Sequence, residues 1–368
     1  MHGRARSEYK AMQRDPKVAA KLAQKAAQWY TLTSQITPDN ALPLTEKLLT
    51  VNPDPLYLWN QRREQFASDS KNASDVKTID WETESRLTAT ALQNNPKAYG
   101  AWFHRKWCLV QLGVSETILQ QELLLTVQFL DRDERNFHCW NYRRFVISLL
   151  LVQQGQSTNN ITNNDSGAGA WNVLIPDTQD QKLLLMGNQL ATSELHIDPD
   201  SKKTNNDNDD ETSSTTTAKS SDWIQHEWEF TNQKIQQNFS NFSAFHYRSK
   251  LYELVQPSLQ EELSVVENAI FTEPDDQTAW WYQSFLLRQT TPKDGRQQAW
   301  EDHVANLREL LEEVPDSKWV VLGLLNCGMQ QNVMPQEEQL ALCKKLQEID
   351  ADRRGRYVSL EKQILHLG

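Results

Sequence analysis

Apolar residues recur along the chain at the spacing of one helix face, in paired segments that short polar turns separate. Leu87, Ala91 and Leu92 lie on one face of a predicted helix. That helix stops at Asn94-Asn95-Pro96, because proline has no N–H to donate and disfavours helix in the residue before it. A second predicted helix follows at once and carries Trp102 on its apolar side. This part of the chain is therefore predicted to form a helix, a turn and a helix.

The same pattern returns several times, and no alternation typical of a β-strand persists. Further segments with this helical pattern are 118–127, 260–271, 304–311 and 340–349, which are followed by turns at 131–133, 273–276, 314–316 and 350–352. The segment 223–237 ends at Asn238 and is followed by a second helical segment, 243–255. One such pair cannot bury its apolar face alone, so neighbours must stack. We predict an all-α, curved solenoid of about seven helical hairpins.

An aromatic residue followed three positions later by Arg or Gln stands seven residues after each main turn. The pairs are Trp59 and Arg62, Trp102 and Arg105, Trp140 and Arg143, Phe245 and Arg248, and Trp280 and Gln283. Positions i and i+3 share one helix face, so a large ring lies beside a planar set of donors. We expect most of these side chains to pack and to bind carbonyls or carboxylates in the groove between hairpins. The nearby His104, His138 and His246 are expected to form hydrogen bonds in the same groove.

Residues 154–222 interrupt this spacing within an otherwise single domain, 1–368. Segments 157–165 and 201–221 are rich in Asn, Ser, Thr and Asp, and they hold too few apolar groups to offset the cost of ordering a backbone. Between them, 179–195 is compatible with a short helix. We predict a low-complexity, largely disordered insert.

Charge and cysteine usage narrow the functional class. The formal net charge of −11 argues against a general nucleic-acid-binding protein. The four cysteines are scattered without metal-ligand spacing, which favours buried free thiols in a reducing, cytoplasmic compartment. No apolar run approaches the length of a membrane span.

The repeats resemble those of protein prenyltransferase alpha subunits. The resemblance lies in W-N-x-R-R at Trp59 and Trp140, in W-x-H-R at Trp102, and in the turn before each. Within that family, residues 238–249 and the opening Met1-His2-Gly3-Arg4 are most similar to the alpha subunit of Rab geranylgeranyltransferase (type II). We expect a fungal-like form without additional immunoglobulin-like or leucine-rich C-terminal domains. Two departures from the family pattern are Phe245 in place of Trp and Gln283 in place of Arg.

The resemblance implies a right-handed, crescent-shaped superhelix that forms an obligate heterodimer with a prenyltransferase beta subunit. The beta subunit would hold the catalytic zinc and the isoprenoid pocket, so this chain would be inactive alone. The implied reaction transfers geranylgeranyl from geranylgeranyl diphosphate to C-terminal cysteines of Rab GTPases, and a Rab escort protein delivers the Rab GTPase to the enzyme.

The same resemblance assigns three candidate site residues. Lys97 and Tyr99 stand where the family places a lysine and a tyrosine that point at the leaving diphosphate. Without the resemblance, Lys97 reads as a solvated turn lysine. His2 corresponds to an N-terminal histidine that can bind the zinc of the partner as an autoinhibitory ligand.

Two alternatives stay open from the sequence. One is a non-catalytic scaffold of the tetratricopeptide type, although the aromatic positions here are separated by 43, 38 and 35 residues rather than by a uniform 34. The other is the alpha subunit shared by farnesyltransferase and geranylgeranyltransferase type I, which would act on a CaaX peptide without an escort protein.

Overall fold

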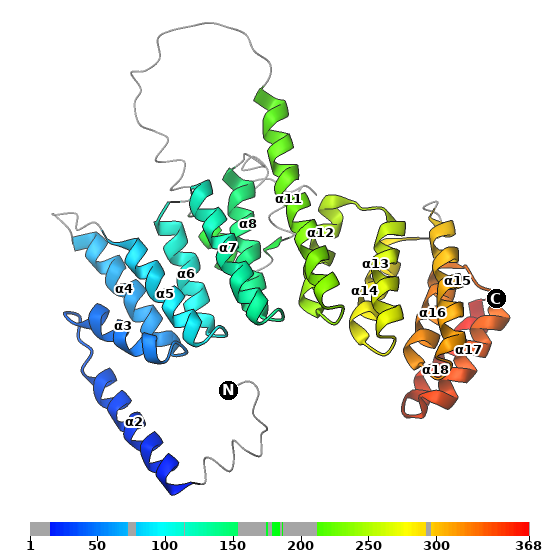
Figure 1. Cartoon of the computed structure of the whole chain (residues 1–368), viewed down its shortest axis with the longest axis horizontal. Helices are drawn as coiled ribbons and strands as arrows, with labels where there is room; N and C mark the ends of the chain where they lie inside the picture. The colour runs from blue at the N-terminus through cyan, green and yellow to red at the C-terminus, as the bar shows by residue number, and fades with distance from the viewer. Residues whose placement is uncertain are drawn as a thin grey trace, which may run out of the picture. The chain divides into compact units, whose positions relative to one another are not determined.

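The computed structural model describes residues 15–72, 79–113, 115–153, 174–175, 179–184, 186, 212–291 and 296–367. Throughout these ranges the regular structure is helical, with no strand, which confirms the predicted all-α helical-repeat fold (Figure 1). The chain divides into two compact units. One comprises residues 1–118 and 182–199, and the other comprises 119–181 and 200–368.

Within residues 15–113, as far as the structure describes them, the first unit has two stacked helical hairpins and one helix outside them. Its helices are α2 (Pro16–Ser34), α3 (Ala41–Val51), α4 (Leu56–Asn72), α5 (Trp81–Asn94) and α6 (Tyr99–Gln111). Helix α3 pairs with α4 and α5 pairs with α6, while α3 packs on α5 and α4 on α6. No residue of α2 is buried.

The second unit repeats the hairpin in chain order, as Figure 1 shows for α11 to α18. Its helices are α7 (Glu116–Arg132), which begins at the boundary between the units, α8 (Phe137–Gln153), α11 (Thr212–Gln237), α12 (Phe242–Val255), α13 (Leu259–Thr272), α14 (Gln277–Gln289), α15 (Gln297–Glu313), α16 (Lys318–Gln331), α17 (Gln336–Ile349), the 3-10 turn η1 (Ala351–Arg353) and α18 (Arg354–Leu367). Helix α12 contacts α14, and α14 contacts α16, so second helices stack on second helices. No helix in the described ranges is long and apolar enough to cross a membrane.

The turns inside the hairpins share one backbone geometry. A backbone N–H donates to the carbonyl three residues earlier, at 3.1 Å from Ala98 to Asn95 and at 3.0 Å from Asn136 to Asp133. The repeat tryptophan then closes the turn, because its indole N–H donates to the carbonyl six residues before it. This bond measures 2.8 Å from Trp102 to Pro96. It recurs at Trp59, Trp140 and Trp280.

The repeat aromatic residues are core residues, as predicted. Their exposed fractions are 0% for Trp59, 2% for Trp102, 3% for Trp140, 0% for Phe245 and 4% for Trp280. Phe245 has no N–H to close its turn and instead packs on Tyr282, with ring centroids 5.1 Å apart. All four cysteines are free and buried, also as predicted.

Most of the segment 154–222 lies outside the described residues. Within it, 179–184 is helical, in agreement with the predicted short helix, and Leu174 and Ile175 are buried. Helix α11 begins at Thr212, before the Trp223 start that the apolar pattern suggests.

Candidate functional site

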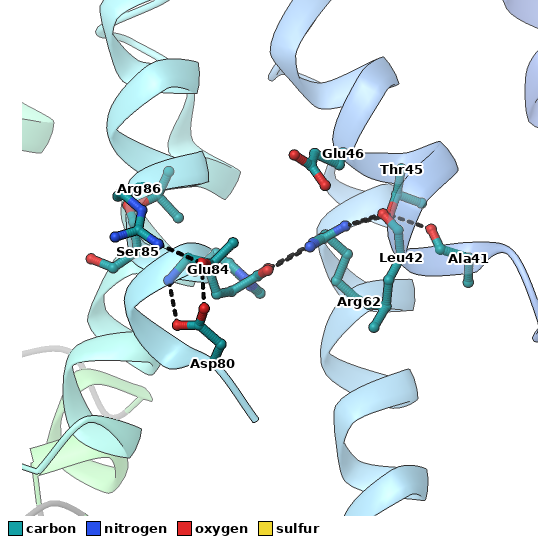
Figure 2. A network of polar contacts seen from close by, with 12 residues as sticks. Ala41, Leu42, Thr45, Glu46, Arg62, Asp80, Glu84, Ser85 and Arg86 are labelled. Atoms are coloured by element: carbon teal, nitrogen blue, oxygen red, sulfur yellow. Dashed lines mark hydrogen bonds and ion pairs between the residues drawn. The ribbon is translucent and has the colours of Figure 1, made fainter. Parts of the chain in front are cut away.

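Arg62 connects two consecutive hairpins through a buried ion pair. Its Nε donates to Oε1 of Glu84 at 2.6 Å, and its Nη2 pairs with Oε2 of the same carboxylate. On its other side, Nη1 donates to Thr45 Oγ1 at 2.8 Å and to the carbonyl of Leu42. Figure 2 shows the guanidinium between these two sets of acceptors. Both charged side chains are only 4% exposed, so this is a dry, two-sided clamp.

The same clamp recurs twice in the second unit. Arg143 reaches Glu227 at 2.7 and 2.5 Å, and Arg248 reaches Glu262 at 2.8 and 2.6 Å. In each case Nη1 also binds a threonine 17 residues earlier on the preceding helix of the same hairpin. The arginines were predicted to be structural, and this geometry confirms that role for them. We refer to these contacts as the Arg–Glu clamps.

Each clamp glutamate has a second partner on its own hairpin, 20 residues later. The hydroxyl of Tyr247 donates to Glu227 at 3.0 Å, and that of Tyr282 donates to Glu262 at 2.6 Å. At Glu84 the partner is His104, whose Nε2 lies 2.7 Å from Oε1. The expectation that His104 forms hydrogen bonds in the groove is thereby confirmed.

Reasoning from the sequence missed these glutamates, although a signal for them exists. In four of the five repeats, all but that of Arg62, a glutamate stands 20 residues before the histidine or tyrosine that precedes the repeat arginine or glutamine. The sets are Glu84 with His104, Glu122 with Tyr142, Glu227 with Tyr247, and Glu262 with Tyr282. A search for charge at constant spacing, and not only for apolar periodicity, could have found them.

The first clamp and its surroundings shift the pKa values of Glu84 and His104. Burial alone would raise the pKa of Glu84, but hydrogen bonds from Arg62 and His104 outweigh it and hold this pKa at about 2. Burial lowers the pKa of His104 to about 4, against the opposing hydrogen bond to Glu84. Glu84 is therefore ionised and His104 neutral at physiological pH.

The fifth repeat has no Arg–Glu clamp. Gln283 stands in the arginine position, and its Nε2 lies 2.9 Å from Nε2 of His303. Nδ1 of His303 lies 2.7 Å from Glu267 Oε1. An amide and an imidazole thus occupy the buried positions that a guanidinium and a carboxylate fill elsewhere.

Lys97 and Tyr99 lie at the N-terminal end of α6. The side chain of Asn95 accepts the Lys97 backbone N–H at 3.0 Å, which sets the turn before the helix. The Tyr99 ring is 51% exposed and stacks on Phe103 with centroids 6.4 Å apart. Ala98 is the N-cap and supplies no side-chain hydrogen bond to the first turn. The positive end of the helix dipole therefore lies beside an exposed lysine and an exposed phenol.

A second cationic side chain, Arg63 on α4, lies against α6. The Arg63 guanidinium lies 5.0 Å from the Phe103 ring centroid, and its Nη1 is 3.0 Å from Nδ1 of His104. Burial lowers the pKa of Arg63. Lys97, Tyr99, Phe103 and Arg63, together with the α6 N-terminus, are called the α6 cluster below.

No three His, Cys, Asp or Glu side chains within the described ranges are grouped as metal ligands would be. His2 lies outside the described residues, so its contact with zinc remains a prediction. The diphosphate roles of Lys97 and Tyr99 likewise remain predictions.

Comparison with known proteins agrees with the repeat structure. The family "Protein prenyltransferase alpha subunit repeat" matches residues 81–112, 119–150, 224–255 and 259–290. Each range contains the two helices of one hairpin, or most of them. These four segments therefore match prenyltransferase alpha subunit repeats, and the resemblance seen in the sequence is confirmed.

Several similar proteins are each named geranylgeranyl transferase type-2 subunit alpha. The one from Bos taurus is 30% identical over 80% of this chain, which spans 43% of that relative's length. The one from Saccharomyces cerevisiae is 27% identical over 88% of this chain and 85% of its own length. The one from Candida albicans is 24% identical over 87% and 84%. The likeness to the type II subunit, fungal proteins included, is thus confirmed over most of the chain.

Proposed function

We propose that this chain is the alpha subunit of a cytoplasmic, heterodimeric Rab geranylgeranyltransferase. In this role it joins a prenyltransferase beta subunit to transfer geranylgeranyl from its diphosphate to C-terminal cysteines of an escort-bound Rab GTPase. The names of its relatives and its alpha subunit repeats support the proposal. The zinc belongs to the beta subunit under this proposal, as the resemblance to prenyltransferase alpha subunits implies.

The observation that carries a catalytic contribution is the α6 cluster. The leaving diphosphate gains negative charge as the bond to the allylic carbon breaks, so donors and cations must already be aimed at it. Lys97 supplies an exposed ammonium, Tyr99 a phenol and the α6 N-terminus a positive dipole end. Together these groups suit a phosphate ligand.

The test compares Lys97→Ala with Lys47→Ala, since Lys47 is an exposed lysine on α3 outside the α6 cluster. A donor aimed at developing charge is typically worth about 3–4 kcal/mol, so single-turnover transfer should slow roughly a hundred- to thousandfold in Lys97→Ala. Lys47→Ala should stay within about twofold of wild type. Gel filtration should show both variants still bound to the beta subunit.

The choice of acceptor substrate separates the alternatives. An escort-bound Rab should be prenylated and a free CaaX peptide should not. Equal transfer by both lysine variants would remove Lys97 from the diphosphate site. Failure of the wild-type chain to bind a beta subunit would contradict the whole proposal and favour a tetratricopeptide-like scaffold.

A further inference from the structure

Two consecutive arginines on α4 have different surroundings. Arg62 is only 4% exposed, and the Glu84 carboxylate balances its charge through two contacts. Arg63 is half-buried, and within the described part of the chain it forms no ion pair. Its guanidinium contacts two neutral acceptors and one aromatic ring, while Glu64 attracts it only from beyond ion-pair distance. A half-buried cation of this kind calls for an anion.

His104 holds one edge of the Arg63 guanidinium. The Glu84 carboxylate is ionised and can only accept, so Nε2 of His104 carries the proton in their 2.7 Å contact. Nδ1 of the neutral ring is then an acceptor, and Nη1 of Arg63 donates to it at 3.0 Å. The buried glutamate of the first clamp thus sets the tautomer that holds Arg63.

Two further contacts complete the position of this guanidinium. Nη2 of Arg63 donates to Oδ1 of Asn60, one turn earlier on α4. The Phe103 ring lies against the guanidinium, with its centroid 5.0 Å from the central carbon. The contacts with His104 and Asn60 use two of the five N–H groups of the side chain, so three remain for an acceptor outside the described residues.

The guanidinium is held beside Tyr99, and therefore beside the proposed diphosphate site. The Phe103 ring that contacts Arg63 also stacks on the Tyr99 ring, with centroids 6.4 Å apart. Arg63 and Tyr99 interact electrostatically as well. Burial lowers the pKa of Arg63, because desolvation disfavours the cation. An anion bound at this point would offset the cost of that desolvation.

The surrounding groups favour a phosphate-type anion over a single carboxylate. The ammonium of Lys97, two residues before Tyr99, is exposed, and the positive end of α6 lies at the same place. A carboxylate carries one negative charge, whereas a diphosphate carries more and offers oxygens to several donors. The planar N–H groups of arginine also match the geometry of phosphate oxygens.

We infer that Arg63 is a second cation of the diphosphate site and donates to phosphate oxygens of the leaving group, while His104 and Asn60 hold it in place. This inference rests on the proposed function. As the thiolate sulfur bonds to the allylic carbon, the bond from that carbon to the diphosphate oxygen breaks. Its electron pair goes to the diphosphate, and a guanidinium that is already fixed stabilises the added charge. Arg63 is thus a catalytic residue, and His104 and Asn60 are positioning residues.

The first experiment uses the co-expressed heterodimer, with inorganic diphosphate as the probe. Arg63→Gln removes the charge but keeps an N–H for His104. Arg86→Gln is the control, since Arg86 on α5 is 69% exposed and already has Glu82 4.0 Å away. Inhibition of lipid transfer by inorganic diphosphate should weaken about tenfold or more in Arg63→Gln, as loss of a charged hydrogen bond does. In Arg86→Gln it should change less than about twofold, and equal inhibition of the two variants would overturn the inference.

A carboxylate of the beta subunit is the competing partner for Arg63. In that case Arg63→Gln would weaken the heterodimer and leave inhibition by diphosphate unchanged. We expect the opposite result, with the subunit dissociation constant within about twofold of the wild type and single-turnover transfer slower by about tenfold or more. A tenfold rise of that constant with unchanged inhibition would also overturn the inference.

The second experiment tests the positioning role of His104. His104→Gln can still donate to Glu84 but lacks the Nδ1 acceptor, so inhibition by diphosphate should weaken about threefold or more. In the Arg63→Gln background the same change should have no further effect, because His104 acts through Arg63. Equal effects in both backgrounds would contradict the positioning role. Asn60→Ala, at an exposed position, should follow the same rule, and it replaces His104→Gln if circular dichroism shows that variant to be unfolded.

Lys97→Ala separates failure at Arg63 from failure of the proposed function. If Lys97→Ala slows transfer and Arg63→Gln does not, Arg63 is not part of the site, while the proposed function stands. If no heterodimer forms, or if inorganic diphosphate does not inhibit the wild type, the proposed diphosphate site fails and the role of Arg63 fails with it.

Discussion

Replacing Arg143 by methionine should unfold the second unit far more readily than its single charge suggests. The substitution keeps the volume and the apolar stem but removes the guanidinium. The Glu227 carboxylate, 0% exposed, would lose both of its short ion-pair contacts and keep the Tyr247 hydroxyl at 3.0 Å and the more distant His226 Nδ1 at 3.6 Å. A charge left buried in this way has lost most of its compensation.

The magnitude follows from that loss. Breaking a buried ion pair on one side costs about 3–5 kcal/mol, whereas an exposed pair contributes about 0–1 kcal/mol. The chain holds a matched exposed pair, in which Arg308 reaches Glu338 at 2.9 and 2.8 Å with side chains 44% and 34% exposed. Arg308→Met should therefore cost less than about 1 kcal/mol.

Urea unfolding followed by circular dichroism measures both variants. The double variant Arg143→Met, Glu227→Gln should regain about 1–3 kcal/mol over Arg143→Met, because the uncompensated charge is gone while an acceptor for Tyr247 remains. Acid provides an independent check. The Arg143 charge opposes burial and lowers the pKa of Glu227, so its removal should let burial raise that pKa above the unfolded value.

The stability that Arg143→Met loses should depend on pH. A carboxyl group with a raised folded pKa stabilises the fold below its unfolded pKa and loses that contribution as pH rises. The difference in free energy of unfolding between the wild type and Arg143→Met should then be largest near pH 7 and shrink towards pH 4.5. If Arg143→Met and Arg308→Met cost the same at pH 7, the Arg–Glu clamps do not stabilise the fold as argued.

Two further outcomes are expected. Burial lowers the pKa of His104 to about 4. Between about pH 6.5 and 4, His104 is therefore protonated in the unfolded chain and neutral in the folded chain. Stability should fall through that window by roughly 2–3 kcal/mol more in the wild type than in His104→Gln, measured as the difference between their pH–stability curves; parallel curves would contradict the assignment. A methyl group on Gly323 would overlap the Trp280 ring, whereas one on Gly355 would meet nothing within 4 Å. Gly323→Ala should cost about 1–3 kcal/mol and Gly355→Ala should stabilise by up to about 1 kcal/mol, and equal melting temperatures would refute the close packing.

The hairpins could be predicted from the sequence because their signals are local. The predicted helix 260–271 is observed as α13, Leu259–Thr272, and the helix predicted to end before Pro96 ends at Asn94. Apolar periodicity and turn chemistry act within about 15 residues, and burial of the repeat tryptophans follows from the same face.

The partners of the repeat arginines could not be predicted in this way. Arg143 and Glu227 are 84 residues apart, and no local rule pairs residues across such a distance. The contact of Gln283 with His303 could not be predicted either, because His303 belongs to the next hairpin, 20 residues later in the chain. The roles of Lys97, Tyr99 and His2 came from resemblance alone and stay predictions.

The Arg–Glu clamps also bear on how such a chain can change length. Inside a hairpin the separations are constant, at 17 residues from threonine to arginine and 20 from glutamate to tyrosine or histidine. Across hairpins the arginine-to-glutamate separation is 22, 84 and 14 residues. The same Arg–Glu clamp thus forms although the chain that connects its arginine and its glutamate differs greatly in length. Insertions are therefore tolerated between hairpins and not within them, so a protein of this kind can acquire new loops without altering its scaffold.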